Sequence, residues 1–507
     1  MANTTEGTVD PEYSRLGKFD FGFETPVSGQ LKIAGRRSSL HLQDDQCLIG
    51  GPSKSLVTGV LHDGNKVTLI ACVSEEQTTR TSEMGARSRF VRMFPHFILE
   101  GQAHVDPQEA NISKVSFGLE HASTLFYDFD AFGRAPNAKA VMDLIASKDK
   151  PGRPLEIGED PEVVYFSGKC RIVETDMALG RLSVEHNPSW SFGGANGVSI
   201  QDFISVCLDF PEPVNFDESL ERLMRLLRFL EFVVGRPQRL LKLRVVVSSV
   251  SKSLPLDVHW SHGPGRGSRD DIDSRSPQPG DILLDAVRRP EEFVTVIRHW
   301  FDTDVERRDA RQRFDAVFAK QRRFDEDRLI GAANMFDLLP ASAVPSAVPL
   351  SDDLAEAKAV AKATFKKLPL SIERDSMLNA LRRLGDATLK HKVKHRAELI
   401  LSKVPPTRFP KLNAVLEAAV DCRNHYVHGA ETGINYRANF NLVVFFTDTL
   451  EFVFGASELV EAGWDINAFI ARGTGMTHPY GTYLVNYEEG LALFENAVPP
   501  KVKPLCS

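Results

Sequence analysis

The chain has 507 residues, enough for two to four domains that each have a core of their own. Its 42% hydrophobic and 25% charged residues are ordinary for a globular protein. The formal charge of −7 does not mark a nucleic-acid-binding protein, although a basic face can exist within an acidic chain. The six cysteines form no CxxC pair, which argues against a disulfide framework or a structural zinc site. We expect no metal site and no cofactor.

The sequence contains no recognisable targeting or membrane-spanning segment. Its N-terminus lacks the positive and apolar regions of a signal peptide. The most apolar stretch, 442–460, contains Asp448, Glu451 and Glu458. Carboxylates are unfavourable inside a bilayer, so this stretch predicts a buried helix. We expect a cytoplasmic protein without a membrane partner.

The first part of the chain is predicted to be β-rich. After a polar tail (1–15), residues 16–213 alternate between apolar and polar, as at Phe19 and Phe21, and Asp63-Gly64-Asn65 is typical of a hairpin turn. This pattern predicts an antiparallel sheet or sandwich domain. Residues 214–280 predict a mixed connector, with a leucine-rich helix that ends at Gly235, a strand at 240–247 and a loop at 263–280.

Residues 281–475 are predicted to be all-α and are followed by a C-terminal extension, 476–507. Within this part, residues 340–349 form a proline-rich linker. The fold class is therefore α+β multidomain, ending in a helical bundle. The expected helices are 281–299, 305–338, 351–367, 373–403 with a possible break, 409–428 and 436–462.

The helix predicted at 409–428 ends in an unusual group of polar residues. Pro410 suits its first position and Gly429 suits its C-terminal cap. Arg423 and His428 fall in the last two turns, and Asn424 and His428, four residues apart, share one face.

This group resembles the RxxxxH motif of HEPN domains, with the polar residue that often follows the arginine. A β-rich front half joined to such a helical module resembles the ApeA-type anti-phage proteins. The segments 17–22 (GKFDFG), 27–31 (VSGQL) and 67–72 (VTLIAC) are similar to the front domain of that family.

The spacing alone is weak evidence, because the tolerance of the family admits five pairs in this chain. Only Arg423 and His428 have the helix, the adjacent asparagine and the terminal glycine; otherwise they would be cationic side chains that favour a helix C-terminus. The other pairs are Arg36/His41, Arg89/His96, Arg181/His186 and Arg472/His478.

The resemblance implies a metal-independent endoribonuclease that acts in abortive anti-phage defence. Histidine can act as base or acid near neutral pH, and arginine matches phosphate oxygens, while asparagine can orient the histidine or donate to phosphate. Cleavage would leave 2′,3′-cyclic phosphate and 5′-OH ends. Arg423, Asn424 and His428 are the expected catalytic residues, with His425 and Tyr426 as auxiliary candidates, although packing is the simpler role for both.

The expected partners are RNA, a second copy bound through the helical domain, and a phage-derived trigger sensed by the N-terminal domain. The helix at 436–462 could belong to the core or to that dimer interface. A basic strip could follow the RNA backbone or be a solvated helix face. Its residues are Arg382, Arg383, Lys390, Lys392, Lys394 and Arg396.

Two alternative functions remain open at this point. The helical module could be a catalytically inactive HEPN domain that binds RNA or dimerises, combined with a ligand-sensing β domain. The chain could also be a sheet-based ligand- or carbohydrate-binding protein with a helical scaffold, although no specific site in the sequence supports this.

Overall fold

The computed structural model describes residues 12–44, 49, 53–75, 78–81, 87–148, 156–192, 197–248, 253–264, 275–431, 433–473 and 475–498. The chain divides into two compact units. Unit 1 consists of residues 1–230, 237–268 and 285–290, and unit 2 of residues 231–236, 269–284 and 291–507. The domain boundaries expected from the sequence stay predictions.

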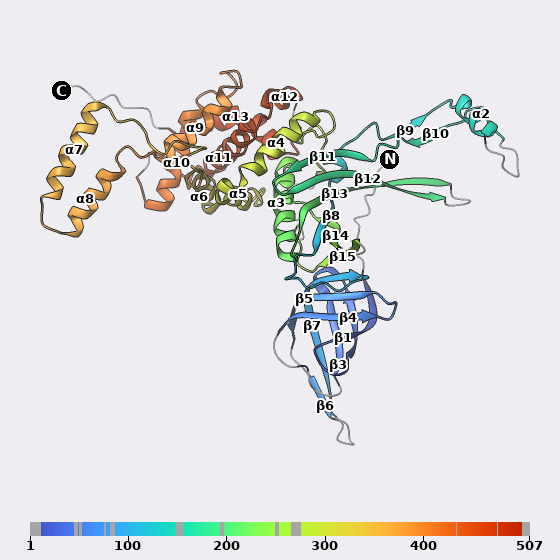
Figure 1. Cartoon of the computed structure of the whole chain (residues 1–507). Coiled ribbons are helices and arrows are strands. Elements are labelled where there is room, and N and C mark those ends of the chain that lie inside the picture. Colours follow the sequence, from blue (N-terminus) through green and yellow to red (C-terminus); the bar gives the residue numbers. More distant parts are fainter. Residues whose placement is uncertain are drawn as a thin grey trace. The chain divides into compact units, whose positions relative to one another are not determined.

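Unit 1 contains a β-barrel, coloured blue in Figure 1. Its strands are arranged in the order β7-β3-β2-β1-β4-β5. The barrel closes because β5 pairs with β7 as well as with β4. The alternation expected from the sequence places Phe19 inside, with Lys18 and Asp20 exposed. The barrel strands are β1 (Tyr13–Asp20), β2 (Val27–Ile33), β3 (Ser39–Asp44), β4 (Ser53–Leu61), β5 (Lys66–Ser74) and β7 (Arg87–Gly101).

The barrel has an apolar interior. Leu31, Leu40, Leu69 and Met93, from four different strands, are among its buried side chains. The predicted hairpin joins β4 to β5, with Gly64 at a φ of +86°. A period of two predicts such strands, but it does not show whether a sheet closes on itself.

The sheet continues from β7 into an open part in the order β15-β14-β8-β13-β12-β11. Strands β14 and β15 come from the segment that the sequence suggested as a connector, yet they lie hydrogen-bonded inside this sheet. Helix α3 (Phe216–Val234) lies along the sheet in Figure 1. The strands are β8 (Ile112–Leu119), β11 (Arg171–Met177), β12 (Gly180–Phe192), β13 (Val198–Val214), β14 (Leu240–Ser248) and β15 (Ser253–Trp260).

Smaller elements complete unit 1. Strand β6 (Thr78–Thr81) pairs with β7, and β9 (Phe132–Ala135) pairs with β10 (Val163–Phe166). The helices α1 (Ala122–Leu125) and α2 (Lys139–Lys148) lie on either side of β9 in the sequence.

Unit 2 is a helical bundle built around α11 (Phe440–Glu461). This helix packs against α5, α6, α9, α10 and α13, and almost all of its side chains are buried. The helix expected at 436–462 is therefore a core helix rather than a dimer interface. The other helices are α4 (Pro290–Asp302), α5 (Asp304–Phe318), α6 (Glu326–Asp337), α7 (Asp352–Lys366), α8 (Ile372–Arg383), α9 (Leu389–Leu401), α10 (Leu412–His428), α12 (Ile466–Ala471) and α13 (Pro479–Ala497).

Several helix predictions for unit 2 need correction. The single helix expected at 305–338 is two helices, because Gln321 adopts a φ of +51° and Asp325 caps α6 through the N–H of Arg328. The helix expected at 281–299 begins only at Pro290, and α10 begins at Leu412, so Pro410 precedes it. The break allowed within 373–403 separates α8 from α9.

The C-terminal extension contains α13, which the sequence analysis missed and which buries Tyr480, Tyr483 and Tyr487. Within the described residues, α10 is consequently followed by three helices, whereas the sequence predicted only the one at 436–462. None of the described helices combines the length and apolarity needed to cross a bilayer.

Candidate active site

The side chains of Arg423 and His428 meet at the C-terminal end of α10. Nη1 of Arg423 lies 3.3 Å from Nε2 of His428, and His428 is exposed. The helix ends here because Gly429 adopts a left-handed conformation, with φ +67°, and its N–H donates to the carbonyl of His425 at 2.9 Å. A guanidinium only donates hydrogen bonds, so Nε2 of His428 is the acceptor in this contact.

Asn424 contacts the arginine of the motif. Its Oδ1 accepts a hydrogen bond from Nη1 of Arg423 at 3.1 Å. Sequence reasoning had given this asparagine a role toward the histidine or toward phosphate. In this arrangement it instead orients the guanidinium that in turn contacts His428.

A fourth residue, Asn334 on α6, also holds Arg423. Its Oδ1 accepts hydrogen bonds from Nη2 of Arg423 at 2.8 Å and from Nε at 3.2 Å, across 89 positions of sequence. Asn334 could not be predicted from the sequence, because no spacing connects it with the motif. Its position depends on the packing of α6 against α10.

In the described part of the chain, no carboxylate neutralises the charge of Arg423. Among the described residues Arg423 forms no ion pair, and its side chain contacts Asn334, Asn424 and His428. These groups orient the guanidinium without cancelling its charge, because the amides are neutral and the imidazole accepts through a lone pair. Arg423 therefore provides a preoriented cation at a partly exposed helix end, which suits a phosphate.

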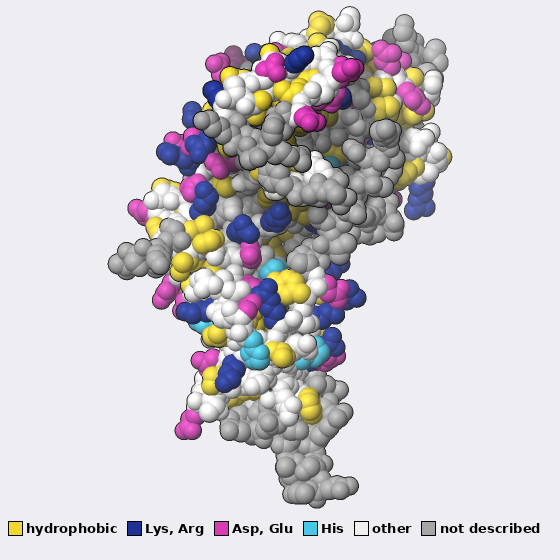
Figure 2. Space-filling model, turned by 90° about the vertical axis from the view of Figure 1, so that its right-hand side faces the viewer, with side chains coloured by type: hydrophobic (Ala, Val, Ile, Leu, Met, Phe, Trp, Pro, Cys, Tyr) yellow, Lys and Arg dark blue, Asp and Glu magenta, His cyan; other side chains and the backbone are white. Residues whose placement is uncertain are grey.

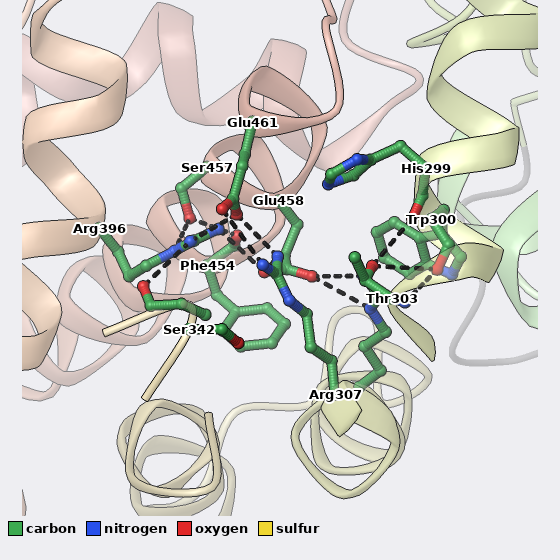
Figure 3. A network of polar contacts seen from close by, with 12 residues as sticks. His299, Trp300, Thr303, Arg307, Ser342, Arg396, Phe454, Ser457, Glu458 and Glu461 are labelled. Carbon is green, nitrogen blue, oxygen red and sulfur yellow. Dashed lines mark hydrogen bonds and ion pairs between the residues drawn. The ribbon is translucent and has the colours of Figure 1, made fainter. Parts of the chain in front are cut away.

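The deeply buried arginines of the same unit are arranged differently (Figure 3). Arg307 donates to Glu458 at 2.9 Å and to Glu461 at 2.7 Å, and Arg396 binds the same two carboxylates at the same distances. Desolvation alone would raise the pKa of Glu461, but Arg307 and Arg396 outweigh it and lower this pKa to about 2. The charges of these arginines are neutralised by structural ion pairs.

One of the predicted RNA-binding residues, Arg396, belongs to this buried ion-pair network. Arg396 has a relative exposure of 0% and also donates to the hydroxyl of Ser457 at 2.8 Å. The prediction that Arg396 belongs to an RNA-binding strip is therefore wrong. Its guanidinium faces the core helix α11, as Figure 3 shows.

The lysines of the predicted strip are partly exposed but paired. Lys390 binds Asp421 at 2.6 Å, Lys392 binds Asp337 at 3.0 Å, and Lys394 binds Glu417. The pairs reduce the positive charge that this face of α9 presents to RNA. Figure 2 shows another face of the molecule, on which basic and acidic side chains are interspersed.

The two arginines at the end of α8 differ from these lysines. Arg382 and Arg383 are exposed, and neither forms an ion pair among the described residues. They are the members of the predicted strip whose charge is available to a ligand.

His425 and Tyr426 have structural contacts. Nδ1 of His425 lies 2.8 Å from the carbonyl oxygen of Ala430, and the ring of Tyr436 lies near both residues. Burial raises the pKa of the Tyr426 hydroxyl, which makes it a poor base at neutral pH. These contacts favour positioning of the α10 terminus over proton transfer.

Two of the other histidines with similar spacing to an arginine have different roles. His478 is buried and caps α13, with Nδ1 accepting from the N–H of Tyr480 at 3.0 Å and Nε2 3.1 Å from the carbonyl oxygen of Phe232. Nδ1 of His186 lies 2.7 Å from Asp202 on the neighbouring strand.

Two family models match the chain. The model described as ApeA N-terminal domain 1 matches residues 14–300, and the model described as Apea-like HEPN matches residues 330–467. The chain belongs to the ApeA-type proteins. The second match contains α10 and therefore the whole RxxxxH group, which makes the chain a HEPN-type defence protein. The ApeA resemblance predicted from the sequence is confirmed, as is a β-rich front followed by a helical HEPN part. No curated protein and no solved structure shows significant similarity to the chain.

Proposed function

We propose that this ApeA-type protein is a metal-independent endoribonuclease of the HEPN type. Arg423, Asn424 and His428 would form its active site, with Asn334 as a positioning residue. The observation that carries this proposal is the contact of Arg423 with His428 at 3.3 Å while the guanidinium has no carboxylate partner among the described residues. A purely structural arginine would be expected to pair as Arg396 does.

The residue types suit transesterification of RNA. His428 would remove the proton from the 2′-OH, whose oxygen then attacks the adjacent phosphorus. Arg423 would stabilise the charge that develops on the non-bridging oxygens, held in place by Asn334 and Asn424. When the bond to the 5′-oxygen breaks and that oxygen takes up a proton, the products carry a 2′,3′-cyclic phosphate and a 5′-OH.

One imidazole serves poorly as both base and acid at a single phosphate. A homodimer formed through the helical unit would bring two copies of the motif to one RNA. His428 of one copy would then act as base while the second copy supplies the acid. His425 and Tyr426 remain auxiliary candidates, with positioning as their simpler role.

Membership of the ApeA-type proteins supports a proposal for the cellular role. The nuclease would act in the bacterial cytoplasm in abortive infection, cutting RNA once a phage-derived trigger has been sensed. Unit 1 would sense that trigger or restrain the nuclease. Arg382 and Arg383 are the residues of the basic strip best suited to contact the RNA backbone.

A substitution panel on the full chain tests the assignment of the site. Arg423→Ala and His428→Ala should each lower RNA cleavage by about 1,000-fold or more, because each removes a group that acts in the transition state. Arg313→Ala and His62→Ala, at exposed positions outside the motif, are the matched controls and should retain activity.

Cleavage that survives both motif substitutions would contradict the proposed site. RNA binding without cleavage by the wild-type protein, even with the phage trigger present, would instead favour the inactive RNA-binding alternative. His425→Ala separates the two histidines, since it should retain far more activity than His428→Ala.

A further inference from the structure

Helices α7 and α8 form an arm that stands apart from the other helices of unit 2 (Figure 1). They pack mainly against each other, and neither buries a single residue. Helix α7 of this arm has 15 residues and is about 22 Å long. Helices of this length gain most of their stability from packing, so the arm lacks the contact surface that such helices usually have.

The base of the arm is fixed. The N–H of Val348 donates to the carbonyl of Gly385 at 2.7 Å, and the N–H of Ala387 donates to that of Ser346 at 3.0 Å. Gly385 itself has a φ of +97°, which suits glycine at this turn. The arm is therefore built to project from a defined point.

The tip of the arm is apolar and basic. Leu370, in the turn that joins α7 to α8, is 85% exposed, and Ile372, the first residue of α8, is 86% exposed. Lys366 and Lys367 precede this turn, and neither forms an ion pair among the described residues. One exposed carboxylate, Glu373, follows the turn, so the two lysines leave the tip with a positive balance. Large apolar side chains exposed together in this way are typical of an interaction site.

The outer face of α13 has matching properties. Val485 is 56% exposed, and Leu493 is exposed two turns later on the same side of the helix. Between them lie Glu488 and Glu489, both exposed and without an ion pair among the described residues. This face therefore offers apolar contacts and negative charge, where the arm tip offers apolar contacts and positive charge.

We propose that the arm tip of one copy of this chain docks on the outer face of α13 in a second copy. A two-fold axis makes the contact reciprocal, because the arm of each copy reaches the α13 of the other. The exposed apolar side chains of Leu370 and Ile372 favour a protein partner over RNA at the tip, and the opposite charges of the two surfaces favour contact between them. This docking rests on the proposed function in one respect: an active site shared between subunits requires two copies of the chain.

Sedimentation velocity of the full-length protein tests this docking. The wild-type chain is expected to be a dimer. Leu370→Asp combined with Ile372→Asp should raise the dimer dissociation constant about 100-fold, since two apolar contacts are lost. Val305→Asp, at a 79% exposed position on α5, is the matched control and should leave the dimer intact.

A charge exchange tests the α13 surface and guards against a folding defect. Lys366→Glu with Lys367→Glu should weaken the dimer about tenfold. Adding Glu488→Lys and Glu489→Lys to the same chain should restore it. Restoration supports the docking, whereas a failure to restore overturns the assignment of α13.

A dimer that withstands the tip substitutions, or a wild-type chain that stays monomeric, would overturn the proposal as a whole. Sedimentation does not depend on cleavage, and His428→Ala should remain a dimer. The docking and the nuclease assignment can therefore fail separately.

Discussion

The guanidinium of Arg423 and the side-chain oxygen of Asn334 meet through two hydrogen bonds, of 2.8 and 3.2 Å. The contact joins α10, which carries the RxxxxH group, to α6. A neutral partner orients the arginine without cancelling its charge. The buried arginines of the same unit are instead paired with carboxylates. The role that we propose for Arg423 depends on this difference between neutral and charged partners.

Changing the partner to a carboxylate should impair RNA cleavage. Asn334→Asp would pair with the guanidinium and compete with the phosphate, so we expect the cleavage rate to fall about 10- to 100-fold with the fold intact. Single-turnover cleavage kinetics and circular dichroism measure the two effects. Asn441→Asp, at an exposed position on α11, is the matched control. Unchanged cleavage by Asn334→Asp would show that the neutrality of this partner is unimportant.

The buried ion-pair network should be structural. Glu458 binds Arg307, Arg311 and Arg396. Glu458→Gln would leave these buried cations undercompensated, and we expect a loss of roughly 3–5 kcal/mol in the free energy of unfolding. Thermal unfolding of the full chain checks this, with the exposed Glu398→Gln as control. A melting temperature equal to that of the wild type would contradict the structural role.

The stability of unit 2 should decrease as the pH falls from about 6.5 to 4. Burial lowers the pKa of His478 from 6.5 to about 4, so within this range the unfolded chain binds a proton that the folded chain does not. The loss should approach about 3 kcal/mol at pH 4. In His478→Asn, an N-cap without a titrating ring, the unfolding free energy should depend less on pH.

Urea unfolding at pH 7.5 and pH 5 measures this dependence. His62→Asn removes an exposed histidine and should behave as the wild type. Equal pH dependence in His478→Asn and the wild type would exclude His478 as the cause.

Paired and unpaired cations should contribute unequally to RNA affinity. Lys390 is already bound by Asp421, so Lys390→Gln should change the dissociation constant only slightly. Arg382→Gln removes an exposed cation without an ion pair among the described residues, so it should weaken binding and reduce the salt slope by about one. Fluorescence anisotropy on the His428→Ala background, at several salt concentrations, gives both numbers. A larger effect at Lys390 would contradict this assignment of the strip.

Local patterns in the sequence predicted much of the architecture. Alternation around Phe19 predicted strands, and the sequence at Asp63-Gly64-Asn65 predicted the β4–β5 hairpin. Closure of the barrel could not be predicted, because it depends on the pairing of β5 with β7. Helix α13 was missed for a similar reason, since its tyrosines are buried only by contact with distant helices.

Only part of the candidate site could be predicted from the sequence. Arg423, Asn424 and His428 lie within six residues at the end of one helix, and Asn424 and His428 share a face, so the sequence could predict that these side chains lie near one another. The roles of Asn334 and Arg396 depend on tertiary packing of α6 and α9 against other helices. A charged residue in a basic stretch can be either exposed or buried in an ion pair, and the sequence alone did not distinguish these for Arg396.

The most direct test of the central claim is the chemistry of the RNA ends. The full-length protein, activated by its trigger where one is required, is incubated with RNA in excess EDTA, and the products are analysed by mass spectrometry. We predict 2′,3′-cyclic phosphate and 5′-OH ends, which are lost in His428→Ala. Products with 5′-phosphate ends, or cleavage that EDTA abolishes, would contradict a nuclease built on Arg423 and His428.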